Sequence, residues 1–297
     1  MKRERLKGDR CTSPFPLYAD PVGKLLAHTS DRDATVAHIL MLAAGYAYAN
    51  IETMSMMMSR IGFAEHDIIS ISEVVDAMYI DTTAYLMRSA CGRVAILSYR
   101  GTSPGSLPDW LGDADVGTDW AHAGFSRNLS ATRLGVMDAL NDRPFDALLV
   151  TGHSLGGALA ALFALSIAAA PEDRAIVDRL RAVYTFGQPM VCRPPLPGHA
   201  RDVTSKIFRH VLPRDVVPAL PPLDYGVFEH CGREYRFHDG AWKLQDKAVE
   251  QLVRFRELPR MLLRRGRVRY GSRDHGPHQY IAALRPDGLI TEFGDRG

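Results

Sequence analysis

The most informative segment of this chain reads Phe145-Asp-Ala-Leu-Leu-Val-Thr-Gly-His-Ser-Leu-Gly-Gly-Ala-Leu-Ala-Ala-Leu-Phe-Ala-Leu165. Its apolar run from Ala147 to Val150 predicts a buried strand, and the alanine-rich run from Ala158 to Ala169 predicts a helix. Between them lies a Gly-x-Ser-x-Gly pattern, which places a serine in a sharp turn from strand to helix. Glycines lack a Cβ and let the strand and the helix approach closely there. We therefore expect Ser154 to be a nucleophile.

The composition is that of an ordinary folded protein. The 297 residues are 46% hydrophobic and 24% charged, with a formal net charge of +2. So small a net charge gives no global field for nucleic acid, and we expect no nucleic-acid partner. The charged N-terminus carries no secretory signal pattern, and no apolar run reaches the ~20 residues of a membrane span. We expect no transmembrane segment and a cytoplasmic location; the alternative is secretion by a route or leader not visible here.

The four cysteines show neither Cys-x-x-Cys spacing nor a small-domain disulfide framework. This pattern favours free thiols in a reducing compartment. The methionines at 54 and 56–58 lack accompanying Cys or His and indicate core packing rather than a soft-metal site. We expect neither a metal nor an organic cofactor.

The chain alternates between predicted strands and helices. Residues 1–30 read as an arm or irregular cover, and residues 31–297 as a single domain. Helical spacing of apolar residues predicts helices over 31–50 and 125–140. Strands are expected at 68–71, 82–87, 93–99, 181–186, 206–212 and 235–238. Such alternation is typical of an α/β fold with a mainly parallel sheet covered on both faces.

A serine nucleophile requires a base and an acid that orients the base. Asp215 is the candidate acid, because it follows the strand at 206–212 and its apolar neighbours would bury it beside a partner. Asp202 and Asp224 are rivals in more open contexts. The candidate bases, His275 and His278, lie in a loop before an apolar helix that starts near Tyr280.

An acyl-transfer site also needs two backbone donors for the oxyanion. One is the N–H of Leu155, at the first position of the helix after the serine. The strand at 94–99 runs directly into Arg100-Gly-Thr102, where glycine permits a close approach. We expect Thr102 to be the second donor.

With these residues identified, the chain resembles the class 3 lipases, the fungal-type lipase family. The matching motifs run in order over residues 82–284. They are Tyr99-Arg-Gly-Thr102, Asp109-Trp-Leu-Gly-Asp113, His122-Ala-Gly-Phe125, Gly152-His-Ser-Leu-Gly-Gly157, Thr185-Phe-Gly-Gln-Pro189, Asp215-Val-Val-Pro218, Phe228-Glu-His-Cys-Gly-Arg-Glu234, and Asp274-His275 with Tyr280.

The resemblance implies an α/β-hydrolase domain with Ser154, Asp215 and His275 as a triad and Thr102 as oxyanion residue. His275 is preferred because a Tyr five positions later matches the family pattern; His278 remains the runner-up. The resemblance also implies a lid over 103–113 that opens at a lipid surface. Its apolar anchors, and thus candidate substrate contacts, are Leu107, Trp110 and Leu111.

A basic amphipathic segment follows between Arg254 and Arg269. It interleaves seven arginines with apolar residues and could lie on an anionic membrane. Packing of its apolar side on the domain is the other interpretation. Peripheral contact with a lipid surface is therefore a hypothesis from this segment.

These expectations define one principal function and its alternatives. We expect a serine carboxylic ester hydrolase, a lipase or esterase acting on acylglycerols or related lipid esters through an acyl-enzyme. Phospholipase A1 and short-chain esterase are alternatives that use the same chemistry. A catalytically silent lipid-binding module on the same fold is an alternative of another class.

Overall fold

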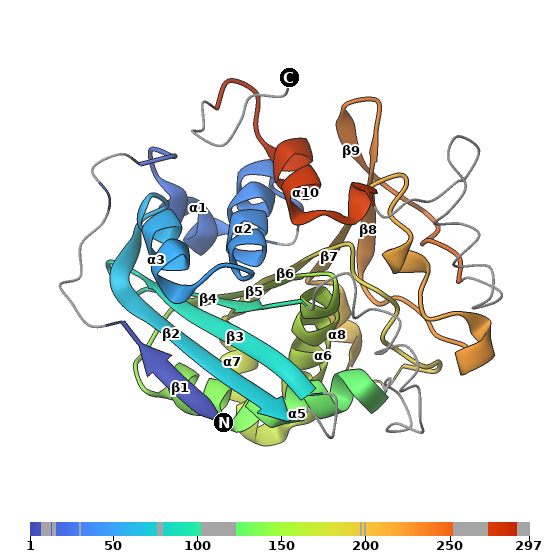
Figure 1. Cartoon of the computed structure of the whole chain (residues 1–297), viewed down its shortest axis with the longest axis horizontal. Helices are drawn as coiled ribbons and strands as arrows, with labels where there is room; N and C mark the ends of the chain where they lie inside the picture. The colour runs from blue at the N-terminus through green and yellow to red at the C-terminus, as the bar shows by residue number, and fades with distance from the viewer. Residues whose placement is uncertain are drawn as a thin grey trace.

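The computed structural model describes residues 1–6, 13, 16–29, 31–75, 80–101, 123–196, 198, 200–251 and 273–289. Within these ranges one nine-stranded sheet crosses the molecule, with its strands side by side in chain order (Figure 1). The strands are β1 (Lys2–Arg5), β2 (Phe63–Val75), β3 (Ile80–Ser89), β4 (Val94–Tyr99), β5 (Ala147–His153), β6 (Leu180–Phe186), β7 (Ile207–Val211), β8 (Arg233–His238) and β9 (Ala241–Leu244).

The centre of this sheet is parallel and its two edges are antiparallel. Strands β4 to β8 pair in parallel with one another. Strands β1 to β4 are antiparallel neighbours, and β9 returns antiparallel to β8. Parallel neighbours require crossover connections, which here contain the helices. The predicted parallel sheet is confirmed for the central strands, whose carboxyl ends meet at one edge.

Helices cover both faces of the sheet, as expected (Figure 1). The helices of one face are α1 (Pro21–Ala27), α2 (Ala34–Tyr46), α3 (Ile51–Ser59) and α10 (Pro277–Leu284). The helices of the other face are α5 (Ala123–Asn141), α6 (Leu155–Ala169), α7 (Arg174–Arg179) and α8 (Ala200–Thr204). The short 3-10 turns are η3 (Pro171–Asp173), η4 (Val217–Ala219), η5 (Leu223–Tyr225) and η6 (Arg273–His275).

The alternation of side chains along β4 divides the core into two layers. Val94 and Ile96 pack toward the α2 side, whereas Ala95, Leu97 and Tyr99 pack toward the α6 side. Because both faces are covered, every residue of β4 and β5 is buried. This double burial explains why the central strands read as continuous apolar runs rather than as alternating ones.

The first thirty residues differ from the irregular cover that the sequence predicts. Lys2–Arg5 forms β1 and pairs with β2 at the edge of the sheet, and Pro21–Ala27 forms α1. The sequence did not predict β1, because all four of its residues are exposed and charged and show no apolar alternation. Asp20 accepts a hydrogen bond from the Gly23 N–H at 2.8 Å, and Pro at the first helical position favours the start of α1.

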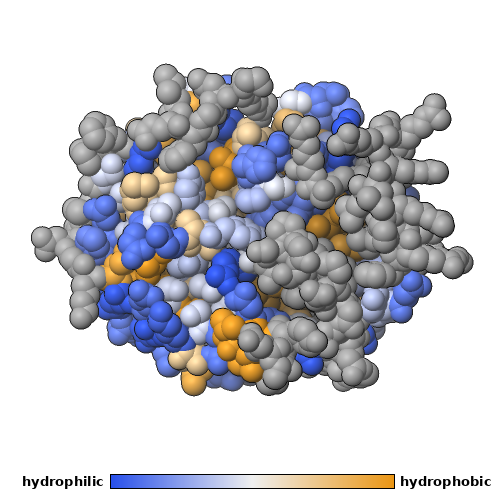
Figure 2. Space-filling view, in the orientation of Figure 1, coloured by the Kyte–Doolittle hydropathy of each residue, from blue (hydrophilic) through white to orange (hydrophobic). Residues whose placement is uncertain are grey.

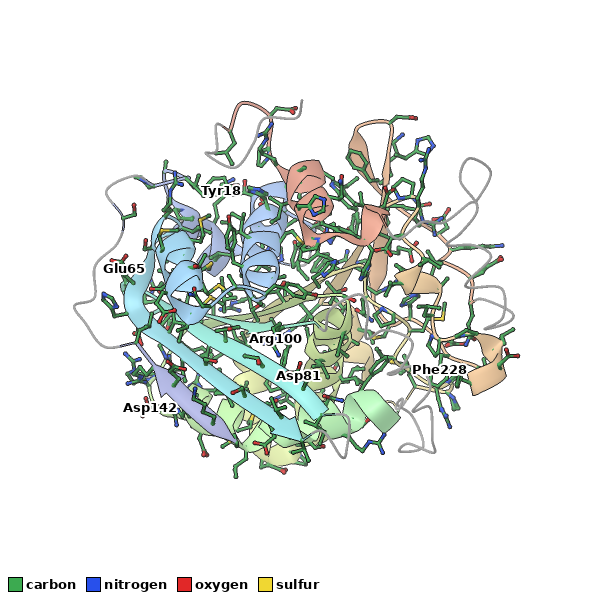
Figure 3. All side chains as sticks on the ribbon, in the orientation of Figure 1. Tyr18, Glu65, Asp81, Arg100, Asp142 and Phe228 are labelled. Carbon is green, nitrogen blue, oxygen red and sulfur yellow. The ribbon has the colours of Figure 1, made fainter. Side chains whose placement is uncertain are left out.

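Ion pairs fasten elements at the sheet edge. Arg100, directly after β4, pairs with Asp81 of β3, and Arg5 of β1 pairs with Asp142 after α5 at 3.0 Å. Figure 3 labels Asp81, Arg100 and Asp142 on this side of the sheet.

On the face drawn in Figure 2, hydrophilic and pale residues predominate among the coloured atoms, and orange residues form separate small patches. Of the described helices, none alone is long and apolar enough to cross a bilayer. By length and composition only, α6 and the segment Pro171–Arg179, which meet at a sharp bend, would together be long and apolar enough.

Two glycines permit the close crossing of β4, β5 and α6. A Cβ on Gly156 would overlap the carbonyl oxygen of Tyr99 at the end of β4. A Cβ on Gly152 would overlap the backbone of Gly156. Backbone atoms cannot rotate aside as a flexible side chain can, so both positions exclude any larger residue. The start of α6 therefore lies against the ends of two neighbouring strands.

Replacement of Gly156 tests this crossing. We expect Gly156→Ala to lower the free energy of unfolding by about 3 kcal/mol or more, because β4 and α6 must separate to admit the methyl group. Urea denaturation measures the change. Gly198→Ala is the matched control, since a Cβ there meets nothing within 4 Å, and it should change stability by less than about 0.5 kcal/mol. Equal stability of the two variants would contradict the close crossing.

Several buried histidines make the fold sensitive to acid. Burial lowers the pKa of His38 to about 4 and places the pKa of His153, His210 and His230 well below the usual value. The unfolded chain, with histidine pKa values near ~6.5, binds more protons than the folded chain below that pH. The free energy of unfolding should therefore fall as pH drops below about 6.5, by up to ~1.4 kcal/mol per pH unit for each histidine.

Urea denaturation between pH 7.5 and 5 checks this expectation. The variant His38→Gln should show a shallower loss of stability than the parent over that interval, since one titrating group is removed. A parent protein whose stability is constant over the interval would refute the assignment of neutral buried histidines.

Candidate active site

Ser154 occupies the turn between β5 and α6 in a strained backbone conformation. Its φ is 58° and its ψ is −126°, a combination that non-glycine residues rarely adopt. The Ser154 N–H donates to the Phe186 carbonyl at 2.9 Å, and the Ser154 carbonyl accepts from the Gly157 N–H at 3.0 Å. These bonds to β6 and α6 hold the serine in place, as the sequence pattern predicts for a nucleophile turn.

His275 brings an imidazole against the serine. It lies in η6, directly before α10, and 121 residues after Ser154. Its Nε2 is 2.8 Å from Ser154 Oγ, and its Nδ1 is 3.0 and 2.9 Å from the two oxygens of Asp215. A neutral imidazole that donates from Nδ1–H to the carboxylate leaves Nε2 free to accept the serine proton. All three side chains are buried, at 1%, 5% and 1% exposure for Ser154, His275 and Asp215.

Asp215 receives further donors from its surroundings. It follows β7, and its Oδ1 accepts from the Val217 N–H at 2.9 Å. The Tyr280 hydroxyl donates to its Oδ2 at 2.6 Å and accepts from the Leu212 N–H at 3.1 Å. Burial and the charge of Asp215 raise the pKa of Tyr280 well above its usual value, so that this phenol stays protonated and remains a donor. The carboxylate is therefore fully satisfied although it is buried.

Gly187 gives the acid and the base room to meet. It follows β6 with a φ of 60°, in the left-handed region that favours glycine. A Cβ at this position would lie 2.6 Å from Asp215 Oδ2 and 3.1 Å from the His275 ring. The Gly187 N–H donates to the His210 carbonyl of β7 at 3.0 Å. The glycine of the Thr185–Pro189 motif thus leaves space for the contact between Asp215 and His275.

His153 and Tyr48 support the base from the other side. His153 Nε2–H donates to the His275 carbonyl at 2.7 Å, and its Nδ1 accepts from the Tyr48 hydroxyl at 2.9 Å. The rings of His153 and His275 lie with their centroids 4.7 Å apart. Burial and the neighbouring His275 lower the pKa of His153 well below its usual value, so it stays neutral with the proton on Nε2. His153 therefore fixes the backbone of His275.

The rival acids and the rival base lie away from this cluster. His278 is exposed, and its ring contacts the side chain of Gln279 at 3.1 Å. Asp202 of α8 and Asp224 of η5 are both exposed. Of the alternatives that the sequence left open, the structure brings His275 and Asp215 to the serine.

Of the remaining predicted site residues, only Leu155 belongs to the part of the chain that the structure describes. Leu155 is the first residue of α6, where N–H groups have no acceptor within the helix. Thr102, the lid candidates Leu107, Trp110 and Leu111, and the basic segment from Arg254 to Arg269 lie outside the described residues. Gly101, next to Thr102, is buried, and a Cβ there would overlap the Tyr48 hydroxyl.

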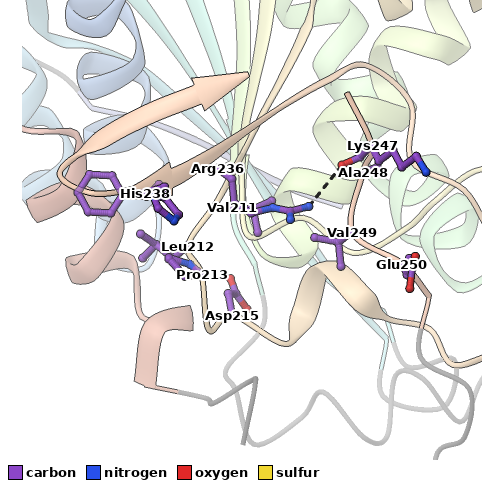
Figure 4. A pocket seen from close by; sticks show the side chains of 11 residues that line it. Val211, Leu212, Pro213, Asp215, Arg236, His238, Lys247, Ala248, Val249 and Glu250 are labelled. Atoms are coloured by element: carbon purple, nitrogen blue, oxygen red, sulfur yellow. Dashed lines mark hydrogen bonds between the residues drawn. The ribbon is translucent and has the colours of Figure 1, made fainter. Parts of the chain in front are cut away.

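A pocket of about 410 Å³ lies beside the acid, between β7, β8 and the segment that follows β9 (Figure 4). Asp215 is part of its wall, and Arg236 reaches across to the Lys247 carbonyl. Neither Ser154 nor His275 lines it. Of the three side chains Ser154, His275 and Asp215, the pocket therefore contacts only Asp215. Among the described residues, no group of three or more His, Cys, Asp or Glu side chains could hold a metal ion.

Sequence reasoning missed the supporting residues rather than the reactive ones. Tyr280 stood out only as part of a motif, and nothing in the pattern indicated that its hydroxyl meets Asp215. Tyr48 lies just after α2 and reaches His153 across 105 positions of the chain. Such long-range contacts leave no periodic signal. The position of Gly187 directly after a predicted strand could have suggested that other groups, here Asp215 and His275, approach the backbone closely there.

The sequence is similar to those of known lipases. A family model described as lipase (class 3) matches residues 96–225. A lipase of Rhizomucor miehei is 32% identical over 176 residues, which are 54% of this chain and 46% of that protein. Triacylglycerol lipase OBL1 of Ricinus communis is 36% identical over 138 residues, 44% of this chain and 26% of that protein. The chain thus spans less than half the length of these curated relatives.

Solved structures show the same fold. The lipase from Rhizopus microsporus var. chinensis superposes with a TM-score of 0.53 at 20% identity, over 97% of this chain and 99% of that one. A triacylglycerol lipase described as having a serine protease triad at its catalytic centre gives a TM-score of 0.51 at 25% identity, over 73% and 84% of the two chains. These likenesses identify the architecture as the α/β-hydrolase fold, as the sequence predicts. Over residues 96–225, and in its alignments with known lipases, the chain is similar to the class 3 lipase family.

Proposed function

We propose that this chain is a serine carboxylic ester hydrolase that acts on acylglycerols or related lipid esters. The observation that carries the proposal is the continuous hydrogen-bond relay from Asp215 through His275 to Ser154. Nucleophile, base and orienting acid lie in the order and at the distances that acyl transfer requires. The relay is buried and its acid is satisfied by further donors.

The first half of the reaction follows from the relay. His275 Nε2 takes the hydroxyl proton of Ser154 while Oγ attacks the ester carbonyl carbon. The imidazolium that forms is held by Asp215, whose carboxylate keeps the ring oriented. His275 then gives the proton to the leaving alcohol, and the acyl group remains on Oγ.

The oxyanion of the tetrahedral intermediate needs donors on the serine side of the carbonyl. The N–H of Leu155 and the positive end of the α6 dipole supply one of them. We assign the second donor to the N–H of Thr102. A water molecule deprotonated by His275 then attacks the acyl-enzyme, and Ser154 is regenerated as the carboxylic acid leaves.

The class of ester is inferred from the relatives. The Rhizomucor miehei protein is named a lipase and the Ricinus communis protein a triacylglycerol lipase. Their names favour lipid esters as substrates of this chain. Phospholipase A1 and short-chain esterase activities use the same relay and differ in head group and acyl length. A silent lipid-binding module would have no use for a strained serine bonded to a buried base.

The first prediction concerns the nucleophile. Ser154→Ala should lower kcat/KM on p-nitrophenyl esters by at least about 10,000-fold, because no Oγ remains to form the acyl-enzyme. The test is hydrolysis of a series from short to long acyl chains, in soluble and emulsified form. The optimum chain length distinguishes esterase from lipase, and a phosphatidylcholine substrate tests phospholipase A1 activity.

Two histidine variants sharpen this test. His275→Ala should abolish activity and labelling by a fluorophosphonate probe, whereas His278→Ala should keep both, since His278 is exposed and away from Ser154. Loss of activity in His278→Ala alone would contradict the assigned base. A folded parent protein that is neither labelled nor active on any ester would favour the binding-module reading.

A further prediction concerns the hydroxyl that supports the acid. Tyr280→Phe removes the donor to Asp215 Oδ2, and we expect kcat to fall by about tenfold, since a hydrogen bond to a charged group contributes roughly 1.5–3 kcal/mol. Steady-state kinetics on the best ester measures the change. Tyr46→Phe in α2 removes a hydroxyl outside the relay and should leave kcat unaltered. An unchanged kcat in Tyr280→Phe would show that the phenol is dispensable.

A further inference from the structure

The pocket drawn in Figure 4 lies apart from the nucleophile and the base. It encloses about 410 Å³, within the ~300–1,000 Å³ that is usual for small-molecule sites. Its walls are the end of β7 with the turn that follows, the strand β8, and the segment 247–250. The chemistry of this lining determines which ligand the pocket could hold.

One part of the lining is apolar. It consists of Val211, Leu212, Pro213, Ala248 and Val249. Val211 and Leu212 are buried at the end of β7, whereas Ala248 lies at the exposed side of the pocket. Removal of apolar surface from water is favourable in proportion to its area, so this wall favours a ligand with a hydrocarbon portion.

One arginine crosses the pocket. Arg236 of β8 reaches toward the Lys247 carbonyl (Figure 4), and its side chain is 33% exposed. Its Nε donates to Glu234 Oε1 at 2.9 Å, and its Nη2 contacts the same oxygen and, at 3.5 Å, the Lys247 carbonyl. These contacts leave the two N–H groups of Nη1 without an acceptor among the described residues. The guanidinium is thus held in place with donors to spare.

The ion pairs around Arg236 leave one positive charge in excess. The side chain of Glu234 is 1% exposed, and its Oε2 accepts from Arg209 Nη2 and from the Val249 N–H, each at 3.0 Å. Two guanidinium groups therefore share one carboxylate. Arg209 is 2% exposed, and its Nε and Nη1 have no hydrogen-bond partner. Water does not reach these buried groups to screen the excess charge.

The other charged groups of the lining do not cancel this excess. Lys247 and Glu250 are both exposed and have opposite signs. The ring of His238 is paired with Asp239 at 2.6 Å. The carboxylate of Asp215 already accepts from the base, from a phenol and from a backbone N–H. An anion that enters the pocket therefore meets a net attraction at the guanidinium, and a cation meets a repulsion.

We propose that this pocket binds a carboxylate with a short to medium alkyl chain. The carboxylate accepts hydrogen bonds from Arg236 Nη1, and the alkyl chain lies along the apolar wall. One excess positive charge matches a monoanion. Hydrogen bonds between a guanidinium and a carboxylate are about twice as strong as neutral ones, and the arginine loses little freedom because Glu234 already holds it. Binding at this pocket does not require the reaction at Ser154.

Isothermal titration calorimetry of the full chain with octanoate, octanol and acetate tests this site. Octanoate should bind at one saturable site. Octanol and acetate should bind at least about tenfold more weakly, because the first lacks the charge and the second lacks the alkyl chain. Concentrated sodium chloride should weaken the binding of octanoate, since it screens the partly exposed guanidinium. Tighter binding of octyl phosphate than of octanoate would contradict the carboxylate as ligand.

Two variants should move the affinity in opposite directions. Arg236→Gln should weaken octanoate binding by about tenfold or more, because a charged donor is lost while Glu234 keeps its other partners. Glu250→Gln should strengthen it by about two- to threefold, because a negative charge leaves the exposed side of the pocket. Arg93→Gln is the matched control and should bind as the parent does, since that side chain is 60% exposed and pairs with Asp146 instead.

The same titrations show how the site could fail. Octanoate that does not bind the parent, or that binds Arg236→Gln and Glu250→Gln as tightly as the parent, would overturn the proposal. Because Glu250 is exposed, its variant gives a readout even if Arg236→Gln does not fold. Binding that a fluorophosphonate adduct on Ser154 abolishes would place octanoate in the active site instead. A chain inactive on every ester would leave the expected binding unchanged, so the two proposals fail separately.

Discussion

The structure depends on the close crossing of one helix over two strand ends. Gly156 lies against the Tyr99 carbonyl of β4, and Gly152 of β5 lies against Gly156. Because the crossing leaves no room for side chains, the chain must reverse within the single residue Ser154, which takes a φ of 58°. The strain is held by the parallel pairing of β4, β5 and β6, which the two apolar layers bury from both sides. A nucleophile in this position is thus a result of packing density.

The groups around the serine come from turns at the strand ends and from one of the two helix layers. The base is fixed by η6 and by His153, the acid by the turn after β7, and the space between them by Gly187 after β6. Tyr280 of α10 and Tyr48 after α2 each supply a hydroxyl from the layer that faces away from α6. Tyr280 donates directly to the acid, and its raised pKa keeps the phenol protonated, whereas Tyr48 acts on the base through neutral His153.

Much of the fold and of the candidate site could be predicted from the sequence. The same physical reasons explain which parts could not be predicted. Buried parallel strands appear as apolar runs, so β4, β5 and β6 were foreseen, whereas β1 and β9 lie at exposed edges and carry no such run. Ser154 was marked by glycines that packing requires, and Asp215 by its place at a strand end. His275 and His278 could not be separated by spacing alone, because the choice depends on how η6 and α10 dock on the sheet. Thr102 stays a prediction.

The wide separation of the relay along the chain has a consequence for the timing of its assembly. Ser154 and His275 are 121 residues apart, and Asp215 lies between them. During synthesis the nucleophile turn, with β4 to β6, leaves the ribosome long before the segment that carries the base. A nascent chain with a folded nucleophile turn is therefore without its base until α10 docks. The complete arrangement of Asp215, His275 and Ser154 would then appear late and all at once.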